Sequence, residues 1–115
     1  MNTLLVIGYV WPEPNSSAAG TRMLQLIQFF QRQGYKVTYA SPASPSEHAI
    51  DYQTLNITPI AIELNSDSFD DFVQALDPSV VLFDRFMMEE QFGWRVEKFC
   101  PNALRLLDTE DLHSL

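Results

Sequence analysis

The stretch Thr3-Leu4-Leu5-Val6-Ile7-Gly8 decides the fold class of this 115-residue chain. Five uncharged and mostly apolar side chains, closed by a glycine, are typical of a strand that is buried on both faces of a parallel sheet. The run is much shorter than the roughly 20 apolar residues that a membrane-spanning helix needs. It also lacks the cationic start and small-residue cleavage site of a secretory leader. We therefore interpret it as the first core strand of an α/β domain.

Strand-like and helix-like patterns alternate along the rest of the chain. Apolar residues recur at helical spacing in three segments: Met23, Leu24, Ile27 and Phe30; Phe69, Phe72, Val73 and Leu76; Met88, Phe92, Val96 and Phe99. Further strands are expected at 36–40, within 57–64, at 80–83 and at 103–107, and residues 41–56 are expected to be irregular or only briefly helical. Because strands separated by helices need right-handed crossovers, the pattern predicts a doubly wound, Rossmann-like parallel sheet of about five strands with helices on both faces.

Composition and charge limit the class of protein. The length and the 46% content of hydrophobic residues fit one globular domain over residues 1–115. A net charge of −8 opposes binding to a phosphate backbone or to an anionic membrane, so we expect no nucleic-acid partner and no strong membrane binding. The single cysteine, Cys100, cannot form an internal disulfide, and no Cys/His cluster has metal-ligand spacing. These features predict a cytoplasmic protein with a buried structural thiol and without a metal site.

Polar residues gather where the strands are predicted to end. In open α/β sheets, ligands bind beyond the carboxyl ends of the strands, where the strand order reverses. With a strand order of 3-2-1-4-5, that point joins the loop 9–20 to the ends of the fourth and fifth strands. The candidate ligand-binding residues are Asn15, Ser16, Gly20, Arg22, Asp84, Arg85 and Asp108. Asp108, Glu110 and Asp111 offer carboxylates for a general base or for hydrogen bonds to hydroxyl groups.

Each of these candidates also has a purely structural interpretation. Ser16 or Ser17 can cap the first helix, and for the serines alone capping is the better interpretation. The pair Asp84-Arg85 is equally consistent with an ion pair at a strand end, and residues 108–111 with a solvated acidic turn. For the loop 9–20 as a unit we favour a ligand site, because a long proline-marked connection is uncommon unless it shapes one.

The aromatic residues give a weaker signal, and two nucleotide motifs are missing. Tyr9, Trp11 and Trp94 can each stack on a sugar face, although Trp94 is expected to be a core or interface residue. The first turn lacks the G-x-G-x-x-G pattern of a dinucleotide cradle, and the chain has no P-loop lysine. The sequence therefore gives no support for a nucleotide bound by this domain.

Several segments together resemble the N-terminal domain of GT-B glycosyltransferases, with the family-4-like group as the nearest match. The matching segments are Ala19-Gly20-Thr21-Arg22, Gln33-Gly34-Tyr35-Lys36-Val37-Thr38 and Asp77-Pro78-Ser79-Val80-Val81. Tyr35 replaces the histidine that these enzymes usually carry before the second strand. The run from Leu106 to His113 resembles the segment after the fifth strand, with Glu110 in the position of the family's histidine and Asp111 matching its aspartate.

The resemblance implies transfer of a sugar from a nucleotide-sugar donor to a carbohydrate or other hydroxyl acceptor, held mainly by this domain. Gly20 and Arg22 are then close to the acceptor or to a phosphate, and Asp84 faces the cleft together with the catalytic candidates Glu110 and Asp111. The family's donor site lies in a C-terminal domain. We therefore expect the chain to be the N-terminal part of a longer two-domain enzyme, with no cofactor of its own, inactive alone, and partnered by that C-terminal domain.

The alternative is a stand-alone flavodoxin-like module that binds a small ligand, or a receiver-type domain, without catalysis. A receiver domain carries paired acids after its first strand and a lysine after its fifth. Here Gly8-Tyr9-Val10 and Asp108-Thr109 occupy those places. The receiver variant therefore fits poorly, and a generic binding module remains as the second interpretation.

Overall fold

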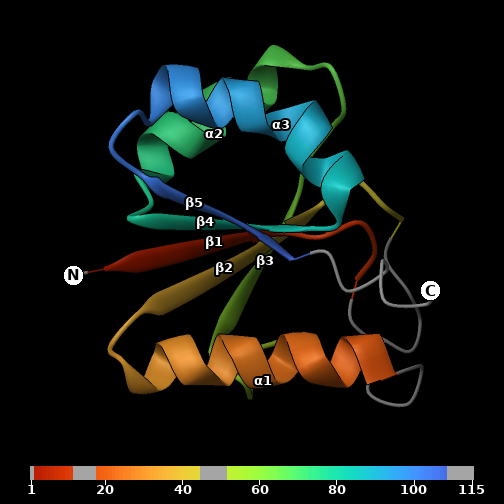
Figure 1. The fold of residues 1–115 in the computed structure, drawn as a ribbon, viewed down its shortest axis with the longest axis vertical. Coiled ribbons are helices and arrows are strands. Elements are labelled where there is room, and N and C mark those ends of the chain that lie inside the picture. The colour runs from red at the N-terminus through yellow and green to blue at the C-terminus, as the bar shows by residue number, and fades with distance from the viewer. Residues whose placement is uncertain (1, 12–17, 45–51, 109–115) are drawn as a thin grey trace.

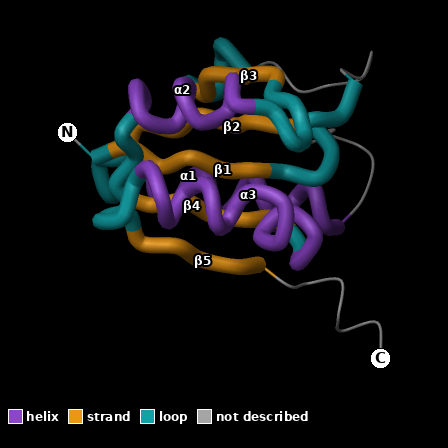
Figure 2. The backbone as a smooth tube through the Cα atoms, turned by 90° about the horizontal axis from the view of Figure 1, so that it is seen from above, coloured by secondary structure: helices purple, strands orange, loops and turns teal. Residues whose placement is uncertain are grey.

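Five parallel strands alternate with three helices in the computed structural model, which describes residues 2–11, 18–44 and 52–108 (Figure 1). The elements are β1 (Thr3–Ile7), α1 (Ala18–Arg32), β2 (Lys36–Ser41), β3 (Ile57–Ala61), α2 (Asp67–Leu76), β4 (Val80–Asp84), α3 (Phe86–Phe99) and β5 (Leu104–Asp108). The sheet is open, and its strand order is β3-β2-β1-β4-β5, as Figure 2 shows from above. The predicted Rossmann-like α/β fold is confirmed, and the strand order is the one assumed in locating the candidate site.

Helices cover both faces of the sheet, with α1 on one face and α2 and α3 on the other (Figure 1). The side chains of β1 alternate between these layers. Leu4 and Val6 belong to the core cluster that includes residues of α1, whereas Leu5 and Ile7 belong to the cluster that includes residues of α2 and α3. All four are inaccessible to solvent, which explains why this strand reads as a continuous apolar run.

The connections place the point where the strand order reverses between β1 and β4. From β1 the chain proceeds through β2 to β3 at one edge, and it then crosses the sheet through α2 to β4 on the other side of β1. The carboxyl ends of all five strands lie along one edge because every neighbouring pair is parallel. The described parts of the β2–β3 connection, 42–44 and 52–56, contain no helix, which agrees with the predicted irregular segment.

Local sequence signals set the ends of the helices. Gly34 follows α1 in the left-handed region, with φ 91°, where a residue with a side chain is strained. Ser66 caps α2, since its side chain accepts a hydrogen bond from the backbone N–H of Ser68 at 3.2 Å. Helix α3 starts at Phe86, two residues before Met88, the first residue of its predicted apolar stripe.

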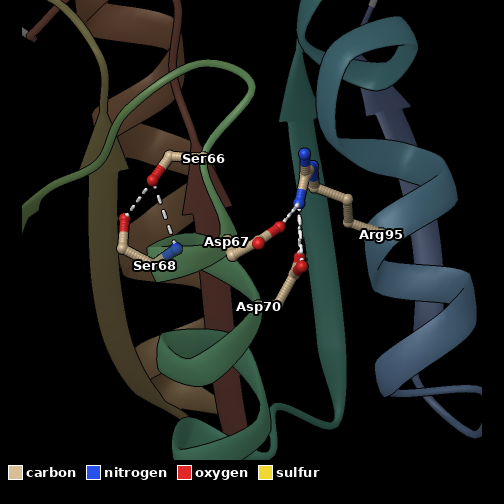
Figure 3. A network of polar contacts seen from close by, with 5 residues as sticks. All are labelled: Ser66, Asp67, Ser68, Asp70 and Arg95. Atoms are coloured by element: carbon tan, nitrogen blue, oxygen red, sulfur yellow. Dashed lines mark hydrogen bonds and ion pairs between the residues drawn. The ribbon is translucent and has the colours of Figure 1, made fainter.

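A buried ion pair joins α2 to α3 (Figure 3). Nη1 of Arg95 lies 2.9 and 2.8 Å from the two carboxylate oxygens of Asp70. Both residues are buried, whereas the nearby Asp67, at 3.7 Å, is fully exposed. The apolar periodicity of the two helices gave no sign of this contact, because Arg95 lies next to the buried stripe of α3 rather than in it.

Two further expectations can be compared with the structure. Trp94 is 53% exposed, so it is not a core residue, and the interface position that was the other half of the expectation stays a prediction. Cys100 is buried, its Sγ donates to the carbonyl oxygen of Val73 at 3.4 Å, and burial followed by the charge of Asp77 raises the pKa of its thiol. The prediction of a structural thiol is thereby supported. Among the described residues, no helix has the length and apolar character to span a bilayer, and no cluster of three potential metal ligands occurs.

Candidate functional site

The carboxyl-terminal edge of the sheet brings together several of the predicted ligand-binding residues. Arg22 comes from α1, Asp84 and Arg85 from the end of β4, and Asp108 from the end of β5. Gly20 lies in the first turn of α1. The remaining candidates, Asn15, Ser16, Glu110 and Asp111, lie outside the described residues, so their roles stay predictions.

Arg22 and Asp108 form an ion pair across the face of the sheet that α1 covers. Nη1 of Arg22 lies 2.5 Å from Oδ1 of Asp108, although the two residues are 86 positions apart in the sequence. Asp108 shares this face with Leu106, which packs on the α1-side core. The carboxylate is therefore held between the sheet and α1, while half of the arginine side chain stays accessible to solvent.

A second carboxylate lies beside the first. Asp84 and Asp108 are register partners in the parallel ladder between β4 and β5, so their side chains leave the same face of the sheet on neighbouring strands roughly 4.8 Å apart. Asp84 also acts electrostatically on Tyr39. Burial is the first cause that raises the pKa of this tyrosine, and the charge of Asp84 is the second. The α1-side face of the edge thus carries two acidic groups.

Below the two carboxylates, the ring of Tyr39 packs over Gly8 at the end of β1. A Cβ atom on Gly8 would lie only 1.9 Å from the Tyr39 hydroxyl oxygen, so the ring occupies the space that any side chain would need. The same hydroxyl donates a hydrogen bond to the carbonyl oxygen of Val10 at 2.7 Å. The glycine at the end of β1 therefore lets a buried tyrosine hold the start of the loop that follows.

The three aromatic residues that were candidates for stacking on a sugar lie in different environments. Trp11 is buried, its Nε1 donates to the carbonyl oxygen of Ala43 at 2.8 Å, and its ring packs against Tyr39, so it is a core residue and not a stacking platform. Trp94 lies on α3 beside the guanidinium of Arg95. Tyr9 remains at the edge, partly exposed, with the guanidinium carbon of Arg85 at 5.0 Å from its ring centroid.

Arg85 has an unusual backbone conformation. Its φ of 79° and ψ of 152° fall in a region that is almost restricted to glycine, where other residues are strained by about 1–3 kcal/mol. Its N–H donates to the carbonyl oxygen of Asp108 at 2.8 Å, and its own carbonyl accepts from the N–H of Met88 at 3.1 Å. A single residue therefore connects β4 to α3, and strain of this kind is concentrated at functional sites.

We expect the substitution Arg85→Gly to stabilise the fold by about 1 kcal/mol. The free energy gained by relieving the backbone strain should exceed two costs, the lost contact with the Tyr9 ring and the greater conformational entropy that glycine gives the unfolded chain. The midpoint of thermal unfolding should rise by about 4–8 °C. Arg85→Ala is the matched control, since alanine loses the same side chain but keeps the strain. Equal midpoints for the two variants would show that Arg85 is not strained.

Two surface depressions lie away from this edge. One is lined by residues that include Gln31, Lys36 and Asn56, and the other by residues that include Asp77 and Cys100. Both adjoin the amino ends of strands, where α/β sheets rarely bind ligands. We therefore locate the candidate site by its charged residues at the carboxyl edge and not by the shape of the surface.

The sequence named the charged residues of the site but missed Gly8 and Tyr39. The position of Gly8 directly after a buried strand was the available signal, because a glycine there often marks close approach of another group. No protein-family model matches the chain, and no curated protein or solved structure is significantly similar to it. The fold and the chemistry of this edge are therefore the features that point to a function.

Proposed function

We propose that the chain is the acceptor-binding domain of a GT-B-type glycosyltransferase, which moves a sugar from a nucleotide-sugar donor to a glycan or another hydroxyl acceptor. The observation that carries the proposal is the meeting of Arg22, Asp84, Arg85 and Asp108 at the carboxyl edge, beside the point where the strand order reverses. Hydroxyl-rich ligands are bound by charged and polar side chains that are held in place by a rigid scaffold.

The chemistry of transfer suits a carboxylate-rich edge. An acceptor hydroxyl becomes a better nucleophile when a nearby base takes its proton, and a carboxylate can do so. Asp84 and Asp108 place two carboxylates on one face, and the predicted catalytic residues Glu110 and Asp111 follow Asp108 directly in the sequence. In this proposal the donor is held by a C-terminal domain, the enzyme is cytoplasmic, and this chain supplies the acceptor side.

The strand order gives no support to the flavodoxin-like alternative. Flavodoxin-like modules have the order 2-1-3-4-5, whereas this sheet has the order 3-2-1-4-5 of dinucleotide-binding folds. A non-catalytic module of another type would use the same edge to hold its ligand. It would differ from the transferase in having no turnover.

The experiment that tests the proposal measures acceptor-dependent release of nucleoside diphosphate. The intact protein is incubated with UDP-, GDP- and dTDP-sugars together with a panel of methyl glycosides. Release that needs both a donor and a glycoside supports the transferase. Binding of glycosides without release from any donor would favour the non-catalytic module.

In the intact enzyme, we expect Gly20→Leu to abolish transfer while the fold is retained. Leucine is the better helix former by up to about 1 kcal/mol, so the first turn of α1 should persist. The bulk at the edge should block approach of the acceptor. The matched control is Gln28→Leu, at an exposed position farther along the same helix, which should keep its activity. Full activity in the Gly20 variant would remove this turn from the site.

A further inference from the structure

The second carboxylate oxygen of Asp108 is the most informative polar atom at the edge. Asp108 is only 7% exposed, and its Oδ1 accepts the hydrogen bond from Arg22. Its Oδ2 is buried and has no hydrogen-bond partner among the residues that the structure describes. A buried acceptor without a donor costs about 1–3 kcal/mol, and more when it is charged. The oxygen is therefore a vacant acceptor that a ligand with a donor group would satisfy.

Neighbouring charges decide which kind of donor can approach. Asp84 is adjacent to Asp108 on the same face, so a phosphate would meet two carboxylates. Arg22 already pairs with Asp108, and the guanidinium of Arg85 lies against the ring of Tyr9. For an approaching anion, the two carboxylates therefore offset the charges of the two arginines, and the net charge of −8 adds long-range repulsion.

A cationic ligand is disfavoured by a different contact. The guanidinium of Arg22 occupies the cation position against Asp108 at 2.5 Å, and it would repel an ammonium group that approached the other oxygen of the same carboxylate. A hydroxyl group donates a hydrogen bond without bringing a charge. A neutral donor therefore satisfies Oδ2 without repulsion from either side, and a hydroxyl is the neutral donor that the proposed acceptor carries.

We infer that the Arg22–Asp108 pair is a binding site for a hydroxyl group of an uncharged, polyhydroxylated ligand, with Oδ2 of Asp108 as the hydrogen-bond acceptor. Arg22 acts as a positioning residue that fixes the carboxylate. This inference rests on the proposed function only where it identifies the bound ligand with the acceptor substrate of the transferase. It goes further by assigning the acceptor class as neutral and by excluding phosphorylated sugars.

Ligand-observed NMR on the intact protein tests this assignment, with methyl glycosides as the neutral probes and glucose 6-phosphate and inorganic phosphate as the charged ones. We expect the wild-type protein to bind at least one glycoside and neither phosphate. Asp108→Asn should weaken glycoside binding by about ten- to a hundredfold, the effect of losing a hydrogen bond to a charged group. The same variant should gain phosphate binding, because Arg22 is released from its ion pair.

Arg22→Gln provides a second variant, which keeps the test decisive if Asp108→Asn does not fold. It should lose less glycoside affinity than Asp108→Asn, and it should not gain phosphate binding, since the guanidinium is gone. Glu97→Gln is the matched control, because Glu97 also pairs with an arginine, Arg105 at 3.1 Å, but on the solvent-exposed side of α3 and β5. This control should bind the probes as the wild type does.

Several outcomes would overturn the inference: tighter wild-type binding of glucose 6-phosphate than of methyl glucoside, no binding of any glycoside, or unchanged glycoside binding in a folded Asp108→Asn protein. Its failure can be distinguished from failure of the enzyme proposal. Glycoside binding that depends on Asp108, without turnover of any donor, leaves the inference standing and removes the transferase. If the enzyme turns over and Asp108→Asn leaves the KM for the acceptor unchanged, the transferase proposal stands and the inference about Asp108 falls.

Discussion

Replacing Asp70 by alanine is expected to lower the free energy of unfolding by about 3–5 kcal/mol, because it leaves the guanidinium of Arg95 buried without its counter-charge. Arg95 contacts both oxygens of Asp70, at 2.9 and 2.8 Å, and both residues are buried between α2 and α3. For a domain of this size, the midpoint of thermal unfolding should fall by about 12 °C or more. Circular dichroism during heating and in a urea titration measures both quantities.

Two further variants separate the loss of this pair from a general effect of lost charge. Asp67→Ala removes an exposed carboxylate that lies 3.7 Å from the same guanidinium, and it should change stability much less. The double substitution Asp70→Leu with Arg95→Met should recover most of the lost stability, because a buried ion pair can often be replaced by apolar residues of similar volume. Equal losses for Asp70→Ala and Asp67→Ala would show that the pair is not buried in solution.

Gly8→Ala should have the second largest effect, a loss of about 2–4 kcal/mol. The new methyl group would lie 1.9 Å from the hydroxyl oxygen of Tyr39 and 2.8 Å from an atom of its ring. Because the tyrosine is almost fully buried, its ring must be displaced within a packed core, which costs about 1–3 kcal/mol. The displacement also breaks the 2.7 Å hydrogen bond to Val10, worth about 0.5–1.5 kcal/mol.

A double-mutant cycle with Tyr39→Ala identifies the cause of this loss. Without the aromatic ring, alanine at position 8 has room, so the substitution should then cost little. The expected coupling energy between the two positions is about 2–3 kcal/mol, measured by urea denaturation at equilibrium. Additive effects in the cycle would mean that Gly8 is required for its backbone and not for the space above it.

The core strands could be predicted from the sequence because they are buried on both faces. Leu4 to Ile7 and Val80 to Phe83 each contact a layer of helices on either side, so an apolar residue is needed at every position and the run is continuous. The helical stripes followed from the same requirement at a spacing of three and four residues. The strand order did not follow in the same way, because right-handed crossovers permit both the 3-2-1-4-5 order and the flavodoxin-like 2-1-3-4-5 order.

The two tryptophans show where reasoning from residue type fails. Trp11 lies in a loop and is 7% exposed, whereas Trp94 lies in a helix and is 53% exposed. On α3 the buried stripe includes Met88, Phe92 and Val96, and Trp94 stands two residues from the latter two, which turns it away from the core. The helical period contained this information, but the size and apolar character of the side chain made a core position one of the two environments expected for it.

The candidate site was predicted as a set of residues, but not as an arrangement. Arg22, Asp84, Arg85 and Asp108 were chosen one at a time because they follow strands or begin a helix. The structure pairs Arg22 with Asp108, leaves the second oxygen of Asp108 without a partner among the described residues, and turns Arg85 toward Tyr9. These contacts are the basis on which we propose a neutral hydroxyl ligand instead of a phosphate, a choice that the residue types alone did not allow.

The sequence by itself determined which segments are strands and helices and that the sheet is parallel, because those features depend on periodicity and on local turn signals. The strand order was assumed and came from the structure. Only the tertiary structure decided that Arg22 meets Asp108 across 86 positions, that Arg95 meets Asp70, and that Tyr39 fills the space over Gly8. Burial of an apolar stripe has a repeating pattern along the chain. A contact between two particular polar side chains depends on distances set by the packing of distant elements, and it leaves no periodic trace.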